Sequence, residues 1–317
     1  MEYNIITKGK MQVFFDNFYF PANNIKKNLK RGRKMPRRTD LALEQRETAG
    51  DCPGIESDEE QRDGIKITRI RIVDEQGERA VGKPMGNYIT VEADSLEGET
   101  DGTCRKVISD ELAQLLPGEG TVLVAGLGNF DITPDALGPK TASQIFATRH
   151  IDGNTVEKLG ISSLRPVCVL SPGVLGKTGI ETAEIIRAVA DKIKPSAVVA
   201  VDALAARELS RLGRTVQISD TGICPGSGVG NSRKEISQKR LGVPVIAVGV
   251  PTVVDAETLA EELTGKPSET KSQKEYKMMV TPREIDSVID HAADLVALSI
   301  NCALQKELSA EEIYLLI

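Results

Sequence analysis

Short apolar segments recur along the chain and predict the strands of a sheet. Residues 66–73 and 87–93 have strand composition, and the first of these alternates between apolar and polar positions. Four further runs are almost wholly apolar, as expected for strands covered on both faces; they are 121–125, 166–170, 197–201 and 244–250. The pattern therefore predicts a sheet whose centre is buried on both sides.

Helical patterns lie between and after these runs. They cover 140–150, 178–193, 203–212 and 282–308. Alternation of strands and helices implies parallel strands joined by right-handed crossovers. We therefore expect an α/β fold, with a mostly parallel sheet, helices on both of its faces and a small β-containing N-terminal portion.

The composition limits the chemistry that is available. The chain has 317 residues, of which 40% are hydrophobic and 27% charged, and no apolar stretch is long enough to predict a membrane span. The only histidines, His150 and His291, are far apart in sequence, which argues against histidine-rich zinc sites and most Ser-His hydrolases. The five cysteines form no C-x-x-C pair, as expected for reduced thiols. We expect no metal site and no cofactor.

Charge divides the chain into a basic leader and an acidic body. The net charge is −6, but residues 1–40 hold ten Lys or Arg and three Asp or Glu. The acidic body argues against direct nucleic-acid binding. The apolar segment 11–20 is interrupted by Asp16 and Asn17, so an export signal is not expected. We expect a leader, 1–40, and a single domain, 41–317; Met35 offers an alternative start that would exclude 1–34.

Acidic residues, glycines and amides follow the apolar runs. In an open α/β sheet, functional groups gather at the carboxyl ends of the strands. Glycines there allow backbone N–H groups to approach a ligand closely. The candidate residues at this edge are Gly126, Gly128, Asn129, Asp135, Lys177, Asp202, Asp220 and Asp255.

Three chemistries could use this edge. The segment 171–178 resembles a nucleotide-binding P-loop but lacks its first glycine, and a tight turn between a strand and a helix explains it equally well. Cys168 and Cys224 are candidate nucleophiles without a histidine nearby in sequence, and Cys168 lies in a buried-strand pattern. Asp135 and Asp202 could work as a pair, one activating water and the other protonating the leaving group. Each aspartate alone could instead cap a helix.

Longer motifs carry a resemblance to a known family. In order along the chain they are 38–44, 126–140, 172–182, 202–207, 217–231, 243–255 and 280–286. Together they span roughly residues 37–307 and resemble the germination protease family of endospore-forming bacteria. A match of this length is far more specific than the short patterns above, and it makes nucleotide binding the weakest of the three chemistries.

The resemblance implies an endopeptidase of an atypical aspartic type, made as a zymogen, whose substrates are the small acid-soluble spore proteins. The family's two proposed catalytic aspartates correspond to Asp135 and Asp202. Self-processing is expected between Asp40 and Leu41, because this site resembles the cleavage sequence of the substrates. The family also implies a homotetramer in the cytoplasm of the forespore or spore core, without a membrane partner. The fold is expected to be similar to the core of hydrogenase-maturation endopeptidases.

Two other functions stay open. The first is a metal-dependent endopeptidase of the maturation type, which would need a metal held by acidic residues and a histidine. The second is a non-catalytic module that binds spore proteins through its acidic body.

Overall fold

A computed structural model describes residues 39–96, 102–158, 160–226, 234–265 and 278–317. Contacts divide the chain into two units, Met1–Arg37 and Arg38–Ile317. The predictions made for residues 1–38, including the alternative start, lie outside the described residues. All elements below belong to the second unit.

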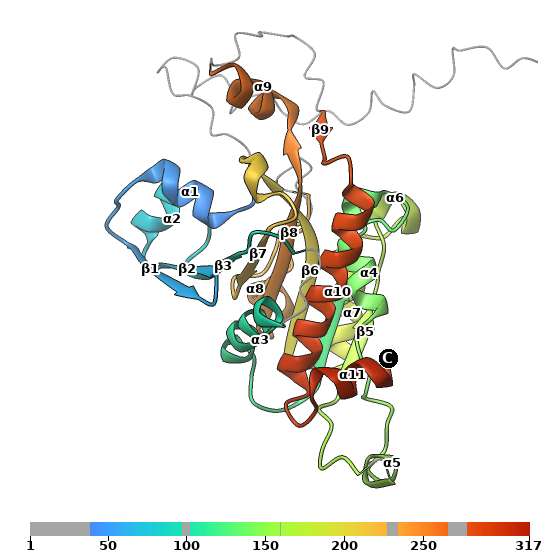
Figure 1. The fold of residues 1–317 in the computed structure, drawn as a ribbon. Coiled ribbons are helices and arrows are strands. Elements are labelled where there is room, and N and C mark those ends of the chain that lie inside the picture. Colours follow the sequence, from blue (N-terminus) through green and yellow to red (C-terminus); the bar gives the residue numbers. More distant parts are fainter. Residues whose placement is uncertain (1–38, 97–101, 159, 227–233, 266–277) are drawn as a thin grey trace, which may run out of the picture. The chain divides into compact units, whose positions relative to one another are not determined.

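The described strands form one mixed sheet (Figure 1). Its order is β1-β2-β3-β7-β8-β6-β4-β5, with β9 paired to β8. The strands are β1 Ile55–Arg62, β2 Ile65–Ile72, β3 Gly86–Glu92, β4 Val122–Gly126, β5 Val167–Leu170, β6 Ala197–Ala206, β7 Thr215–Ser219, β8 Val245–Asp255 and β9 Met279–Val280.

Helices cover both faces of this sheet, which confirms the expected α/β class. The α-helices are α1 Ala42–Ala49, α2 Glu75–Val81, α3 Thr103–Leu115, α4 Leu137–Ser143, α5 Gly153–Lys158, α6 Leu175–Thr178, α7 Thr182–Ile193, α8 Gln238–Leu241, α9 Ala256–Thr264, α10 Ile285–Leu304 and α11 Ala310–Leu316. Two 3₁₀-helices, η2 Thr133–Asp135 and η3 Leu209–Arg211, follow β4 and β6.

Among the described strands, β4 pairs in parallel with β5 and β6, and β6 pairs in parallel with β8, whereas the other strand pairs are antiparallel. Parallel neighbours need a long crossover, whereas an antiparallel pair can be joined by a hairpin of two residues. Asp63 and Gly64 form such a two-residue turn between β1 and β2, both with positive φ. The small N-terminal β portion is thus continuous with the main sheet.

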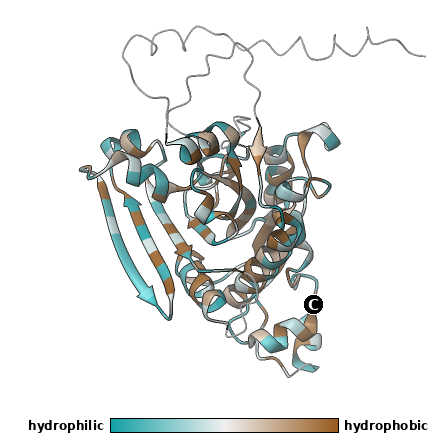
Figure 2. Ribbon diagram, turned by 45° about the horizontal axis from the view of Figure 1, so that its top comes forward, coloured by the Kyte–Doolittle hydropathy of each residue, from teal (hydrophilic) through white to brown (hydrophobic). Residues whose placement is uncertain are grey.

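The two faces of the central strands have separate cores. Val199 and Val201 of β6 pack in one core with residues of α3 and α10, whereas Val198 and Ala200 pack with Ile186 of α7 on the other side. Figure 2 shows the central strands as largely hydrophobic and the outer strand β1 as hydrophilic. The two cores are separate because successive side chains along a strand point to opposite faces of the sheet.

Helix α10 is the long closing helix that the sequence predicts. By length and composition alone it is apolar enough to cross a membrane. Eleven of its 20 residues are buried, however, and the hydrophobic ones among them belong to the core that it shares with α3 and the sheet. In the described fold it is therefore a core helix.

The prediction of a helix over residues 203–212 is wrong. These residues continue β6 to Ala206, and only Leu209–Arg211 forms a short 3₁₀ turn. Alanine and leucine favour a helix locally, but pairing with β8 from Ala203 onward overrides that preference. Asp202 therefore lies inside a strand and caps no helix.

Candidate functional site

A cavity of about 620 Å³ opens beside the carboxyl ends of β4 and β6. Its lining comes from distant parts of the sequence, including the β4–η2 turn, β6, β7 and the turn before β3. The ionisable and amide side chains among the lining residues include Asp40, Lys83, Asp135, Asp202 and Gln217. The two predicted catalytic aspartates and Asp40 of the predicted processing site thus line one cavity.

Asp202 is held in place by the sheet. It stands opposite Gly249 of β8, which in turn stands opposite Gln217 of β7. Residues directly opposite one another in a sheet point to the same face, so Asp202 and Gln217 share a face with only a glycine between them. The carboxylate of Asp202 accepts a hydrogen bond from the backbone N–H of Ala203 at 3.0 Å, and the residue is 5% exposed.

Asp135 is fixed by the turn that follows β4. The backbone N–H of Asn129 donates to the Asp135 carboxylate at 2.9 Å and to its backbone oxygen at 3.0 Å. Gly128 adopts a φ of +111°, and a Cβ there would lie 2.1 Å from the Asp135 backbone oxygen. Gly126 has a different role, because a Cβ there would lie 2.1 Å from the backbone oxygen of Gly138 in α4. The three residues predicted as site support therefore shape the turn and its helix.

The residues around the predicted processing site lie against β6. The backbone N–H of Asp40 donates to the Ala205 oxygen at 2.8 Å, and the Ala205 N–H donates to the Asp40 carboxylate at 2.9 Å. Leu41 is fully buried, in a cluster with Leu204, Leu212 and Val254. The segment that precedes α1 is therefore anchored by both backbone pairing and apolar packing.

Gln217 and Lys83 both reach the backbone of this segment. The Gln217 amide donates through Nε2 to the Asp40 carbonyl oxygen at 3.1 Å and accepts at Oε1 from the N–H of Ala42 at 2.6 Å. Lys83 Nζ donates to the same Asp40 oxygen at 2.9 Å. Burial lowers the pKa of Lys83, although the nearby Asp40 and Cys224 act in the opposite direction.

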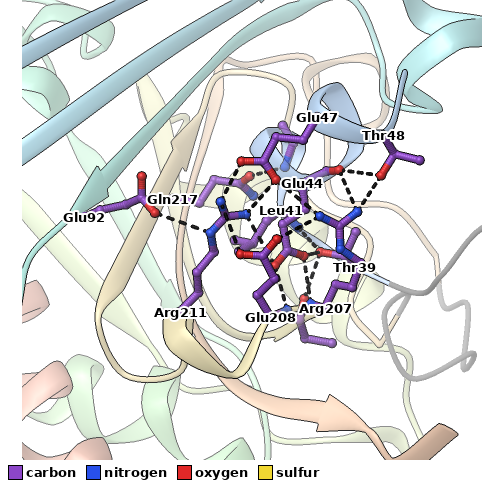
Figure 3. A network of polar contacts seen from close by, with 12 residues as sticks. Thr39, Leu41, Glu44, Glu47, Thr48, Glu92, Arg207, Glu208, Arg211 and Gln217 are labelled. Atoms are coloured by element: carbon purple, nitrogen blue, oxygen red, sulfur yellow. Dashed lines mark hydrogen bonds and ion pairs between the residues drawn. The ribbon is translucent and has the colours of Figure 1, made fainter. Parts of the chain in front are cut away.

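Glu44, in the first turn of α1, is fully buried and surrounded by donors (Figure 3). Its carboxylate accepts from the backbone N–H groups of Arg207 at 2.8 Å and Glu208 at 3.0 Å, and from the hydroxyl of Thr39. Arg211 lies 3.4 Å from it. A buried carboxylate of this kind fastens α1 to the end of β6.

Arg211 connects Glu44 to a wider acidic group. It also pairs with Glu47 at 2.7 Å and Glu92 at 3.3 Å (Figure 3). Burial disfavours the charge of Arg211, but its hydrogen bond to Glu47 and the surrounding carboxylates outweigh this and raise its pKa. The charge of this arginine is therefore well compensated.

The structure does not bring the remaining candidates to the cavity lining. Lys177 pairs with Asp131, and Asp220 accepts from the backbone and side chain of Asn87. Asp255 caps α9 by accepting from the N–H groups of its first turn. These three side chains therefore form contacts outside the cavity that hold parts of the fold together.

The two candidate cysteines lie in different surroundings. Cys224 lines the cavity, whereas Cys168 lies in β5, where burial raises the pKa of its thiol. Among the described residues, no group of three or more His, Cys, Asp or Glu side chains is placed to hold a metal ion.

Sequence reasoning missed Lys83, Gln217 and the pocket around Glu44. Gln217 and Glu44 both fall within motifs that carry the family resemblance, which is the one signal that could have drawn attention to them. Nothing in the local pattern around Lys83 distinguishes it from other surface lysines.

Comparisons with known proteins agree with the motifs. The model of the germination protease family matches residues 33–264. A germination protease of Caldanaerobacter subterraneus subsp. tengcongensis is 46% identical over 313 residues, covering 87% of this chain and 96% of its own. Those of Clostridium tetani and Bacillus pumilus are 43% and 38% identical, covering 87% and 86% of this chain and 98% and 95% of theirs.

Solved structures also match, among them one at low similarity. The NiFe hydrogenase maturation protease HycI of Thermococcus kodakarensis aligns with a TM-score of 0.33 and 18% identity, covering 60% of this chain and 98% of that one.

The sequence matches define the class as proteases, which hydrolyse peptide bonds. The chain belongs to the germination protease family, which confirms the resemblance carried by its motifs. It is therefore a spore-germination endopeptidase.

Proposed function

We propose that this endopeptidase uses Asp135 and Asp202 as its general acid and base, and that it processes itself between Asp40 and Leu41. The observation that carries the proposal is the shared cavity, whose lining includes both aspartates and Asp40. The family resemblance adds the substrate, the small acid-soluble spore proteins. A homotetrameric state and a location in the spore core stay predictions.

The mechanism follows from two carboxylates held on separate elements. One carboxylate removes a proton from water, which attacks the carbonyl carbon of the peptide bond. The other is protonated and gives its proton to the departing amide nitrogen as the C–N bond breaks. Two carboxylates at one site favour this division, because a nearby negative charge makes it harder for the second to ionise.

Self-processing is supported by the way the chain presents residues 39–44. The Asp40–Leu41 bond belongs to a segment that is hydrogen-bonded to Ala205 of β6 and packed on that strand, which also carries Asp202. Fixing a reacting bond beside catalytic groups replaces an encounter in solution with an intramolecular step.

The test compares the full-length parent with Asp135→Asn and Asp202→Asn variants. Each protein is incubated alone and with a small acid-soluble spore protein, and fragments are identified by mass spectrometry. We expect the parent to expose Leu41 as a new N-terminus and to cut the spore protein. Each variant should be slower by at least about a hundredfold, the usual contribution of one general acid or base.

Asp131→Asn is the matched control, because Asp131 lies in the same turn but outside the cavity lining and is paired with Lys177 at the surface. It should cleave like the parent. Undiminished cleavage by both aspartate variants would refute the two-aspartate mechanism. A parent that cuts the spore protein but never exposes Leu41 would refute self-processing at this bond.

A further inference from the structure

The carbonyl oxygen of Asp40 accepts two side-chain hydrogen bonds. Lys83 Nζ is 2.9 Å from it and Gln217 Nε2 is 3.1 Å from it. Both distances lie in or at the edge of the range found for donors that stabilise an oxyanion. The donors come from unrelated parts of the chain, the turn after α2 and the middle of β7.

The orientation of the Gln217 amide is determined by its other partner. Because Oε1 accepts from the N–H of Ala42, Nε2 must face the Asp40 carbonyl. One planar amide thus spans the Asp40–Leu41 bond, with a contact on either side of it. Gln217 is 8% exposed, so these hydrogen bonds are shielded from water and electrostatically stronger than they would be at the surface.

Asp40, whose carbonyl these two side chains hold, also lines the cavity of the two aspartates. Gln217 shares a sheet face with Asp202, with only Gly249 between them in register. Lys83, Gln217, Asp135 and Asp202 all contribute to the cavity lining. Two carboxylates alone would leave the charge that develops on the carbonyl oxygen without a partner, whereas a lysine and an amide N–H supply one.

We propose that Lys83 and Gln217 form the oxyanion site of this protease and act on the carbonyl oxygen of the bond being cleaved. The inference rests on the proposed function, in which that bond is Asp40–Leu41 and the corresponding bond of a spore protein.

In the addition step, the water oxygen bonds to the carbonyl carbon and its proton goes to one carboxylate. The electron pair of the C=O bond moves to the oxygen, whose negative charge is held by the two donors. In the second step this pair re-forms C=O, the C–N bond breaks, and the nitrogen takes a proton from the other carboxyl group. Water is the only co-reactant.

The test measures self-cleavage of the full chain and turnover of a small acid-soluble spore protein by Lys83→Met, Lys83→Arg and Gln217→Met variants. Loss of one oxyanion donor typically reduces kcat by about 10²- to 10³-fold. We expect that loss in kcat for both methionine variants, with KM changed by less than about threefold, since the donors act most strongly on the charged intermediate. Lys83→Arg should recover much of the loss, because it restores a charged donor.

Lys66→Met is the control, since Lys66 of β2 forms a surface ion pair with Glu59 and is not among the residues that line the cavity. It should match the parent. Thermal unfolding of each variant establishes that it is folded, and Lys83→Arg keeps the test decisive if a methionine variant unfolds.

Parent-like kcat in folded Lys83→Met and Gln217→Met would overturn the oxyanion site. An effect confined to KM would also overturn it, because Lys83 and Gln217 would then bind the substrate without stabilising the charged intermediate. These outcomes are distinct from a failure of the proposed function, which would show as cleavage by the Asp135→Asn and Asp202→Asn variants or as an intact Asp40–Leu41 bond in the parent, and which would overturn both ideas.

Discussion

At the scale of single residues, Glu44 is a fully buried acidic side chain surrounded by hydrogen-bond donors. A carboxyl group that is removed from water needs several hydrogen bonds to replace those it made with water. Glu44 obtains them from two consecutive backbone N–H groups and a hydroxyl, with Arg211 as its counter-ion. It therefore joins the start of α1 to the turn after β6, which also positions the neighbouring Leu41.

Replacing Glu44 with Gln should lower the free energy of unfolding by about 1–3 kcal/mol, because an amide cannot serve all these donors and leaves buried groups unsatisfied. Urea unfolding of the full-length protein measures the change. Glu59→Gln is the control: Glu59 is exposed on β1 and forms a surface pair with Lys66, so its loss should cost less than about 1 kcal/mol. Equal unfolding midpoints for the two variants would contradict this account of Glu44.

At the scale of elements, the packing of α4 against β4 depends on glycine. The space that a Gly126 side chain would need is filled by the backbone of Gly138 and by Ala142. Close approach of the helix to the strand fixes the β4–η2 turn between them, and with it the backbone of Asp135.

Gly126→Ala should therefore cost about 1–3 kcal/mol, since its Cβ meets backbone atoms that cannot rotate away. Gly118→Ala is the matched control, because nothing lies within 4 Å of the position its Cβ would take. It should change stability by no more than about 0.5 kcal/mol. If chemical denaturation gave the two variants the same stability, the close packing of α4 on β4 would not depend on a glycine at position 126.

The sequence predicted the elements best where burial alone decides them. The apolar runs that became β4, β5, β6 and β8 were recognised because strands covered on both faces have few alternatives. The extension of β6 was missed because residues 203–206 are helix-favouring in isolation, and the pairing that makes them a strand comes from β8, more than 40 residues away.

The candidate site was predicted only in part, for a similar reason. The family resemblance indicated Asp135, Asp202 and the Asp40–Leu41 bond. Gln217, by contrast, contacts Ala42 across 175 residues of sequence. Contacts of this kind depend on the sheet order, and no local pattern around Gln217 could predict that β7 lies next to β8 and close to the segment before α1.

At the scale of the whole molecule, Asp40, which precedes the predicted cleavage bond, lines the cavity of its own chain together with Asp135 and Asp202. Asp40 pairs with β6, the strand that carries Asp202. A second molecule is therefore not needed to bring the bond to the carboxylates, and self-processing should occur within one chain.

Processing within one chain gives a half-time that does not depend on protein concentration, because no encounter is required. We expect the half-time for exposure of Leu41, measured by mass spectrometry, to stay constant over about a hundredfold dilution. Full-length Asp202→Asn mixed with a small amount of parent should keep its leader. A half-time that lengthens in proportion to dilution would show that one molecule processes another.

The position of Leu41 has a consequence for the processed enzyme. Hydrolysis of the Asp40–Leu41 bond would release the residues before it, but Leu41 would stay tethered to α1, in the apolar cluster with Leu204, Leu212 and Val254 that it already occupies. A tethered segment competes with free ligands as though it were present at a concentration on the order of millimolar. A spore protein would then have to displace a resident competitor of the same chain, so the strength with which Leu41 and Glu44 are held would help to set how much substrate the enzyme needs.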